Sequence, residues 1–522
     1  MRISTALRRA VLLTTAGAFI SCGDATGPHT PGIYVRSGAD VSDTVFASPV
    51  DPLTVEVIGD DGAPVPGVVV RFQAVPLSDT RSPWSWGRTW VSLGDSITRA
   101  DQQFIFDTTD VNGRASAYVQ FGAVAGSGTM VTINAPALDM DATATFTIQP
   151  GAPAGVTVAP RDSAMYVGQS YALRGAVVDE WGNPRSDPVS YHVASTSSAV
   201  DLDATGTISA REIGRSYVAV TALGWTDSAW VSVVPHGRFA AVKAHRITGD
   251  TASLVLMNMD GSDARWFPVN YWAEPHPDWA PSGTSLTVED GGHYPGFDPR
   301  IVTFDADGAT HSIVDSTLGL QAEFFPQYST DGEWIYFAGR PPNVQGHTEL
   351  WRVHPDGTGA ERIGEPAGYY EGDTQPSPSP TGRRVVFTTS RFKCCYGLTV
   401  RVLDMTTGAI DSLGAQNGKP IPGLTPLWSP VDENLIVYGN GNPKYTNVNA
   451  LTLFAMRPDG TDRHAITPPD IAVRPSFDWS PDGKWMIAQS FDTDVLELIE
   501  VETGRILPLG FTKGMTQPAW KP

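Results

Sequence analysis

Short runs of apolar residues, many of them alternating with polar ones, follow one another along most of the chain from residue 33 onward. Residues 53–57 (Leu-Thr-Val-Glu-Val) show the period of two that places every second side chain on one face of a β-strand. Clusters of Gly, Pro, Asp and Asn separate these runs, as at residues 60–67, and tight turns need such residues. The pattern predicts an all-β protein built from many short strands.

A short phrase recurs in the second half of the chain, with its clearest copy at residues 477–483 (Phe-Asp-Trp-Ser-Pro-Asp-Gly). Its aromatic position falls at residues 279, 328, 378 (here Pro), 428, 479 and 520, so the steps are 49, 50, 50, 51 and 41 residues. A second recurrent turn contains Gly261, Gly308, Gly357, Gly408, Gly460 and Gly504. Two turns and four short strands in each period predict the four-stranded antiparallel blade of a β-propeller.

The order of the two turns predicts how the ring closes. Because the first copy of the second turn precedes the first complete phrase, we expect residues 516–522 to supply the inner strand of the blade begun by residues 238–267. The phrase and its following turn resemble the repeats of TolB-type propellers over nearly all of residues 236–522. This resemblance implies a six-bladed β-propeller closed by the C-terminal strand, and it implies no particular activity.

Two further β-rich regions precede the repeat. Residues 33–150 resemble the bacterial Ig-like domain of the invasin/intimin type, although an insertion near residues 77–106 departs from that family's pattern. The phrases that carry this resemblance are at residues 60–72, 109–119 and 126–135. Residues 151–235 resemble the second group of bacterial Ig-like domains, through phrases at residues 165–169, 177–184, 203–210 and 213–216. Both resemblances imply Ig-like β-sandwiches, which act as spacers or as adhesive modules.

Residues 1–21 are typical of an export signal. Three arginines precede an apolar stretch at residues 10–20, which is too short to span a bilayer as a stable helix. Residues 19–23 (Phe-Ile-Ser-Cys-Gly) resemble a bacterial lipobox, with Phe where Leu is usual, which implies that Cys22 is lipidated. Residues 22–32 are then a flexible tether. An ordinary signal peptide with an incidental Cys is the alternative.

The other two cysteines, Cys394 and Cys395, are adjacent in the sequence. A disulfide between them would close a strained ring and would be easily reduced, so we consider a vicinal disulfide and two free thiols as alternatives.

Composition and motifs exclude several classes of function. The net charge of −20 argues against a nucleic-acid partner, because phosphate binding needs a basic face. The ten histidines show no metal-ligand spacing, and no serine-hydrolase elbow, phosphate loop or dinucleotide fingerprint is present. The Asp-rich turns lack the spacing of a calcium loop. We therefore expect no metal, no cofactor and no enzymatic activity.

The loops between the stereotyped turns are long, varied and rich in aromatic, Arg, His and Asn residues. In a four-stranded blade these loops emerge on one face, and a variable face on a regular scaffold is typical of a binding surface. The candidate ligand-binding residues are Trp272, His276, His293, Tyr294, Phe324, Arg340, His347, Tyr369, Tyr370, Arg391, Tyr445 and Arg474.

The sequence thus favours a monomeric, exported protein, anchored to a bacterial membrane by lipid, whose propeller loops bind a protein or a glycan. One alternative is a polysaccharide lyase or hydrolase that works from the propeller face. A second alternative is a cell-surface adhesin that acts through the Ig-like domains.

Overall fold

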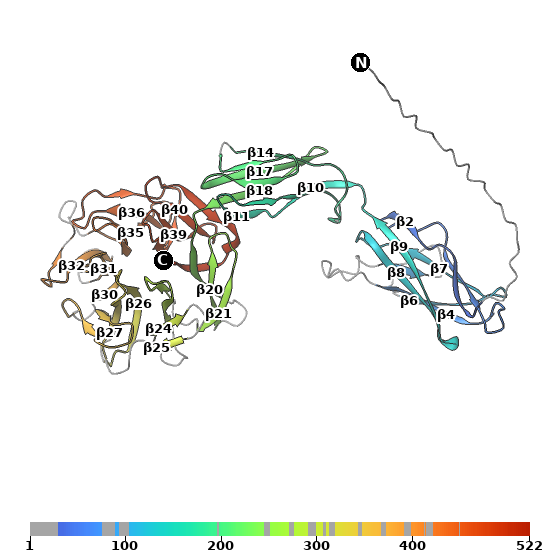
Figure 1. Ribbon diagram of the computed structural model, residues 1–522, viewed down its shortest axis with the longest axis horizontal. Coiled ribbons are helices and arrows are strands. Elements are labelled where there is room, and N and C mark those ends of the chain that lie inside the picture. Colours follow the sequence, from blue (N-terminus) through green and yellow to red (C-terminus); the bar gives the residue numbers. More distant parts are fainter. Residues whose placement is uncertain are drawn as a thin grey trace, which may run out of the picture. The chain divides into compact units, whose positions relative to one another are not determined.

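The computed structural model of the protein describes most of the chain from residue 30 onward. The described residues are 30–75, 89–92, 104–195, 198–244, 251–270, 276–290, 299–305, 310–312, 319–342, 347–366, 372–390, 398–411, 413, 421–447 and 449–522. Their regular elements are strands and two short 3-10 helices, η2 (Pro136–Leu138) and η4 (Gly510–Thr512). The prediction of an all-β protein is therefore confirmed (Figure 1).

The chain forms two compact units. The first extends to Gly155 and includes Val177–Ser186, and the second contains Val156–Ala176 and Asp187–Pro522.

In the first unit, two sheets share one hydrophobic core. One sheet has the order β1 (Gly32–Ser37), β3 (Leu53–Ile58), β7 (Arg114–Gln120), β5 (Trp90–Ser92). The other has the order β2 (Val41–Thr44), β9 (Met140–Gln149), β8 (Gly126–Ala135), β4 (Val69–Val75), β6 (Phe104–Thr108). Every second residue of β7 is buried, so its apolar side chains enter a core that also holds Phe72, Phe121 and Phe146.

Residues 177–186 lie with the first unit, although the sequence places them in the second Ig-like region. The carboxylate of Asp179 accepts hydrogen bonds from the backbone N–H groups of Gly151 (2.8 Å) and Asn183 (2.9 Å). The Asn183 side chain in turn donates to the carbonyl of Ala123 at 2.7 Å. These buried polar contacts fix the turn, and the predicted boundaries at residues 150 and 235 stay predictions.

The second unit begins with smaller sheets around a core that includes Met165, Ile208 and Val231. One sheet has the order β11 (Asp162–Tyr166), β18 (Trp225–Val234), β17 (Gly214–Ala222), β14 (Ser190–Val193), with β11 parallel to β18. Another has the order β12 (Ser170–Ala172), β16 (Thr207–Ala210), β15 (Val200–Leu202). Strands β10 (Pro153–Ala159) and β13 (Arg174–Asp179) pair with each other.

The rest of the second unit consists of four-stranded antiparallel groups arranged around a common centre (Figure 1). We call them blades 1 to 6 in chain order, with the strand nearest the centre first. Blade 1 contains β42 (Met515–Trp520), β19 (Arg238–Ala244), β20 (Thr251–Asn258) and β21 (Arg265–Asn270). Blade 2 contains β22 (Asp278–Trp279), β23 (Ser285–Asp290), β24 (Arg300–Asp305) and β25 (Thr310–Ser312). Blade 3 contains β26 (Ala322–Tyr328), β27 (Ile335–Arg340), β28 (Glu349–Val353) and β29 (Glu361–Arg362).

The last three blades follow the same plan. Blade 4 contains β30 (Asp373–Pro378), β31 (Arg384–Thr389), β32 (Thr399–Asp404) and β33 (Ile410–Asp411). Blade 5 contains β34 (Leu424–Trp428), β35 (Ile436–Gly441), β36 (Leu451–Met456) and β37 (His464–Ala465). Blade 6 contains β38 (Val473–Trp479), β39 (Trp485–Ser490), β40 (Leu496–Glu500) and β41 (Ile506–Leu509). One residue pair, Leu451↔Val473, links blades 5 and 6.

The second strand of each blade is mostly buried on both faces, whereas outer strands such as β29 and β37 are exposed. All six residues of β39 and five of the six residues of β27 are buried. Sheets that pack face to face around a ring leave no solvent face, so these strands are nearly continuous apolar runs instead of alternating ones. Strand β42 pairs antiparallel with β19, and Trp520 lies opposite Phe239.

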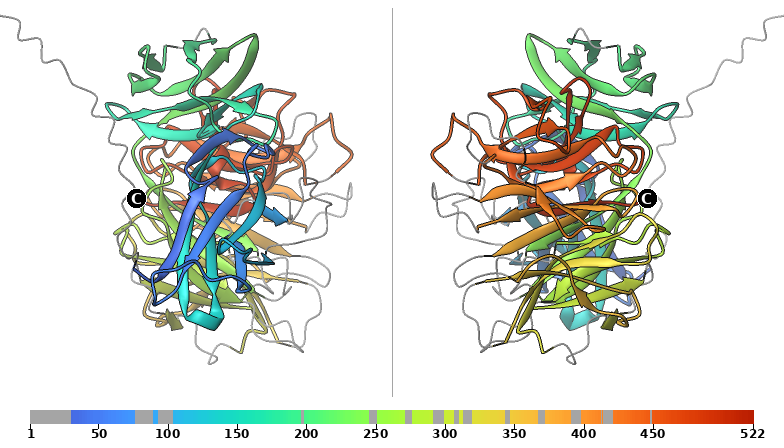
Figure 2. Two further views of the ribbon diagram at one scale, coloured as in Figure 1. Left: turned by 90° about the vertical axis from the view of Figure 1, so that its right-hand side faces the viewer. Right: turned by 90° about the vertical axis from the view of Figure 1, so that its left-hand side faces the viewer.

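The sheet of β11 and β18 packs against blade 6 within the second unit (Figures 1 and 2, green strands beside red ones). Tyr166 and Val234 share a core with Phe239, Trp485 and Leu509. No helix among the described residues is long and apolar enough to cross a bilayer.

Candidate functional site

In five copies of the repeated phrase a proline lies two positions before the aromatic position: Pro277, Pro326, Pro376, Pro426 and Pro518. A constriction at the centre of the blades is built from the residues that precede these prolines. These residues are His276, Phe325, Gln375, Thr425 and Gln517, with φ angles of 35°, 54°, 54°, 49° and 50°. In blades 1, 3, 4 and 5 the register between the inner strand and its neighbour shifts at this point. A β-bulge of this kind re-aims a side chain out of the regular strand pattern.

The backbone at these positions is strained. A positive φ is unfavourable for residues other than glycine, and a following proline further restricts the residue before it. Each such residue costs about 1–3 kcal/mol and persists only where the surrounding structure holds it. The positive φ recurs at the equivalent position in five blades, so it is a regular feature of the blade structure.

Side chains of one blade hold the bulge of the next. The side-chain oxygen of Gln517 accepts a hydrogen bond from the N–H of His276 at 3.3 Å. The side-chain oxygen of Gln375 accepts one from the N–H of Thr425 at 2.8 Å, and Thr425 Oγ1 donates to the carbonyl of Pro475 at 3.1 Å. The constriction is therefore a hydrogen-bonded link between neighbouring blades.

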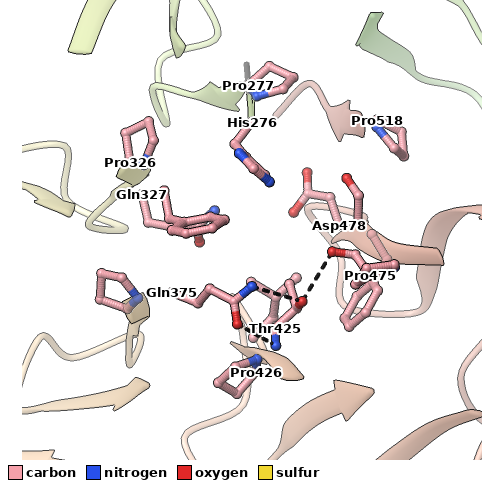
Figure 3. A pocket seen from close by; sticks show the side chains of 15 residues that line it. His276, Pro277, Pro326, Gln327, Gln375, Thr425, Pro426, Pro475, Asp478 and Pro518 are labelled. Carbon is pink, nitrogen blue, oxygen red and sulfur yellow. Dashed lines mark hydrogen bonds between the residues drawn. The ribbon is translucent and has the colours of Figure 1, made fainter. Parts of the chain in front are cut away.

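The pair of His276 and Glu289 forms the polar corner of the constriction. The Nδ1 atom of His276 lies 3.0 Å from Oε1 of Glu289, and Glu289 is 2% exposed. The same carboxylate oxygen accepts the N–H of Phe325 at 2.5 Å, and the rings of His276 and Phe325 are 4.4 Å apart. Figure 3 shows His276, Gln375 and Thr425 around a common opening, with prolines behind them; the cavity here has a volume of about 50 Å³.

The residue immediately before the aromatic position of the phrase makes a second link between blades. The side chains of Asp278, Ser377 and Asp478 accept the backbone N–H of the phrase's aromatic residue in the following blade. The partners are Tyr328 (2.6 Å), Trp428 (3.0 Å) and Trp520 (2.7 Å) respectively. These contacts agree with the interpretation of the phrase as blade construction.

Two of these carboxyl groups, Asp278 and Asp478, interact across the channel. Burial raises the pKa of Asp478 to about 7. Burial, together with the charge of Asp478, raises the pKa of Asp278 well above its usual range. At neutral pH the pair therefore holds protons that isolated carboxyl groups would have lost.

The Asp residues of the turns have a local role. In blade 3, Asp331 accepts hydrogen bonds from Ser329 Oγ (2.5 Å) and from the N–H of Glu333 (3.0 Å). Asp482 makes the equivalent bond with Ser480 Oγ at 2.7 Å. Each carboxylate closes its own turn, and the described residues contain no group of three or more His, Cys, Asp or Glu able to hold a metal.

Outside the constriction, a pair of residues in blade 3 combines a cation with an aromatic ring. The guanidinium of Arg340 lies 5.3 Å from the ring centre of Phe324, at the loop end of β26 and β27. The Arg340 Nε atom is buried and has no hydrogen-bond partner among the described residues.

A larger group of the same kind lies at the loop end of blades 5 and 6. The guanidinium of Arg474 is 5.2 Å from the ring centre of Phe491, and its Nε is also buried without a partner in the described part of the chain. Tyr445 packs edge-on against Phe491 at 5.2 Å and donates its hydroxyl to Asp492 at 2.6 Å. Lys444 Nζ lies 5.1 Å from the Tyr445 ring centre.

The structure thus groups five of the predicted binding residues near the loop ends of the blades: His276, Phe324, Arg340, Tyr445 and Arg474. His347 differs from these five residues, because its side chain is only 6% exposed. The remaining predicted residues lie outside the described residues: Cys22, Trp272, His293, Tyr294, Tyr369, Tyr370, Arg391, Cys394 and Cys395.

Sequence reasoning missed Gln375, Thr425 and the Asp278–Asp478 pair as channel residues. The position immediately before each phrase proline recurs with the phrase, and this regularity could have identified the constriction.

No protein-family profile matches the chain. An uncharacterized protein from Agrobacterium fabrum is 32% identical over 209 residues, which are 38% of this chain and 65% of that protein. The chain therefore spans slightly less than two thirds of this relative. Among solved structures, TolB from Acinetobacter baumannii has a TM-score of 0.43 and 14% identity, over 65% of this chain and 84% of TolB. An oligogalacturonate lyase in complex with manganese has a TM-score of 0.35 and 13% identity, over 64% and 97% of the two chains.

Proposed function

We propose that this protein is an exported binding protein, anchored by lipid at Cys22, whose propeller binds a peptide or glycan segment over the loop end of its channel. In this proposal β42 closes a ring of six blades, and the two preceding β-regions are Ig-like spacers. The pairing of β42 with β19 supports the closure.

The observation that carries the proposal is the placement of Arg340 and Arg474. Each guanidinium rests on a phenylalanine ring and has a buried Nε without an acceptor among the described residues. Such an Nε–H is satisfied when a ligand brings a carbonyl, carboxylate or hydroxyl oxygen to it. Arg340 is in blade 3 and Arg474 is in blade 6, so in a six-membered ring they stand on opposite sides of the channel.

The aromatic residues beside these arginines fit the same ligands. Phe324, Tyr445 and Phe491 are each only partly buried at the loop ends. Partly exposed aromatic rings next to Arg are the residues that contribute most to protein recognition, and they also stack on sugar rings.

The test is binding of the purified protein to peptide and glycan arrays, compared with variants. We expect Arg340→Ala and Arg474→Ala each to weaken binding about tenfold, the effect of losing one charge-assisted hydrogen bond. Arg352→Ala is the matched control, because Arg352 rests on Trp334 at 4.0 Å at the other end of blade 3. Equal losses in all three variants, or no binding by the unmodified protein, would refute the proposal.

The pair of His276 and Glu289 favours a second candidate, a polysaccharide lyase or hydrolase. A histidine oriented by a buried carboxylate is a suitable general base. Turnover of polysaccharides by the unmodified protein, and its loss in His276→Ala, would establish this alternative in place of simple binding.

A further inference from the structure

A small slot between blades 1 and 2 lies at the end of the blades that carries the short turns, which we call the turn end. The slot has a volume of about 40 Å³ and is lined by Arg238, Phe239, Leu256, Arg265, Trp279 and Lys521. Three of these residues are cations and none is acidic. A cleft lined by charges of one sign attracts ions of the opposite sign, so this slot is a candidate anion site in a chain whose net charge is −20.

The strand pairing of blade 1 brings the three cations together. Arg238 is the first residue of β19, and its carbonyl accepts the N–H of Lys521 at 2.8 Å. Arg265 is the first residue of β21 and lies opposite Leu256, which is also part of the slot's wall. Because the three cations stand at the same end of one antiparallel sheet, the ladder of the sheet holds them around a single opening.

The charges around the slot do not cancel. Arg238 and Arg265 share one acid, Asp263, whose carboxylate oxygens lie 3.0 Å and 3.7 Å from the two guanidinium groups. Lys521 has no acidic partner among the described residues, and its Nζ lies 5.3 Å from the centre of the Trp279 ring. Three positive charges and one negative charge leave about two positive charges, which would balance a phosphate group near neutral pH.

The slot also offers hydrogen-bond donors that the fold leaves unused. Trp279 is 5% exposed, and its indole Nε1 has no partner among the described residues. Arg238 donates to the carbonyl and the carboxylate of Asp263, and a guanidinium has five N–H groups, so further donors stay available. Trp428 and Trp479 also have a buried Nε1 without a partner, so it is the three cations that distinguish the slot beside Trp279.

The size of the slot favours a small tetrahedral anion. A cavity needs about 10–15 Å³ to hold one water, so about 40 Å³ suits a group of a few heavy atoms. A carboxylate has two oxygens, which one guanidinium can bind as a pair, whereas a phosphate group presents at least three oxygens to donors on separate residues. Arg238 and Lys521 also line a neighbouring cavity of about 630 Å³, whose wall includes Tyr166. The rest of a phosphate ester has room there.

We propose that the slot formed by Arg238, Arg265 and Lys521 binds a phosphate group. Inorganic phosphate and the phosphate ester of a larger molecule share this chemistry. The slot is at the turn end of blades 1 and 2, so the proposal is independent of the binding at the loop end proposed above.

Isothermal titration calorimetry of the purified protein at pH 8 and constant ionic strength tests the proposal. We expect inorganic phosphate to bind at least about tenfold more tightly than acetate, which has one charge and two oxygens. This comparison uses the unmodified protein and does not depend on any variant folding. Glucose 6-phosphate identifies the source: binding tighter than that of inorganic phosphate indicates an ester, and weaker binding indicates the free ion.

Variants locate the site. Arg238→Gln, Arg265→Gln and Lys521→Gln are each expected to weaken phosphate binding about tenfold, because each loses one charge-assisted hydrogen bond. Lys484→Gln is the matched control, because the Lys484 side chain is 74% exposed in blade 6 and the variant removes one positive charge from the turn end without touching the slot. The proposal is wrong if phosphate does not bind, if acetate binds as tightly as phosphate, or if Lys484→Gln weakens binding as much as the other three variants.

Discussion

Replacing Asp478 by Asn should change how the stability of the protein depends on pH. The Asp478 carboxyl faces the channel, and its pKa is raised to about 7, against about 3.9 in an unfolded chain. Between these two values the folded protein holds a proton that the unfolded chain has released. Asp478 therefore stabilises the fold fully below about pH 4, and this contribution is lost as the pH rises through 7.

The magnitude follows from the size of the shift. A shift of about three pH units corresponds to at most about 4 kcal/mol, since each unit is worth about 1.36 kcal/mol. This figure is an upper limit, because Asp478 and Asp278 titrate as a pair and the shift does not belong to Asp478 alone. Asn carries no charge, and it leaves the N–H of either Trp479 or Trp520 without an acceptor, at a cost of about 1–3 kcal/mol that is the same at every pH.

Thermal unfolding at pH 5, 6, 7 and 8, followed by tryptophan fluorescence, measures both effects. Asp478→Asn should melt below the unmodified protein at pH 5, and the difference should shrink or reverse by pH 8. For a domain of this size, 1 kcal/mol corresponds to about 2–4 °C. Asp331→Asn is the control. Burial alone would raise the pKa of Asp331, but the hydrogen bonds from Ser329 and Glu333 outweigh it and lower the pKa. The ionised Asp331 therefore stabilises the fold most at high pH, and the destabilisation by Asp331→Asn should be largest there. A difference between Asp478→Asn and the unmodified protein that stays constant from pH 5 to 8 would refute this account of the channel.

Three further predictions concern the constriction and the anchor. Gln375→Leu removes the acceptor of the Thr425 N–H and should destabilise the protein by about 1–3 kcal/mol in thermal unfolding, whereas Gln375→Glu should retain most of the stability. Thr425→Asn should be neutral or stabilising by up to about 1 kcal/mol, because Asn tolerates a positive φ, while Thr425→Val should lower the melting temperature through loss of the bond to Pro475. Cys22→Ser should release an exported protein from the membrane fraction, and unchanged retention of this variant would exclude lipid anchoring at this residue.

The strands and the role of the repeated phrase could be predicted from the sequence, because both depend on local rules. Strand β39 begins with four apolar residues, and the Ser-Pro-Asp-Gly turn before it supplies its own hydrogen bonds. The burial of His347 could not be predicted. Its loop contains Pro341, Pro342, Asn343 and Gly346, which indicate exposure, and burial depends on tertiary packing. The electrostatic interaction of Asp278 with Asp478 joins residues 200 positions apart in the sequence, which no local pattern reports.

The left-handed backbone of the constriction was unpredictable for a different reason. Local rules place the residue before a proline in an extended conformation, so they predict a regular strand at His276, Phe325 and Gln375. The structure has left-handed backbone at all three positions. The N–H groups of His276 and Phe325 donate to the side chains of Gln517 and Glu289, which are distant in the sequence. These interblade hydrogen bonds outweigh the local preference.

In five copies of the phrase, the proline two positions before the aromatic residue lies between the strained residue of the constriction and the residue that faces the next blade. Proline has no N–H to donate, so the ladder between an inner strand and its neighbour is interrupted there, and a bulge at that position sacrifices no further backbone hydrogen bond. The bulge directs the preceding residue, such as Thr425, toward the constriction, and the residue after the proline, such as Asp278, faces the next blade. Both positions carry hydrogen bonds between blades, as at Gln375 and Asp478. A substitution at either position should therefore change the lining of the channel and the stability of the blades together.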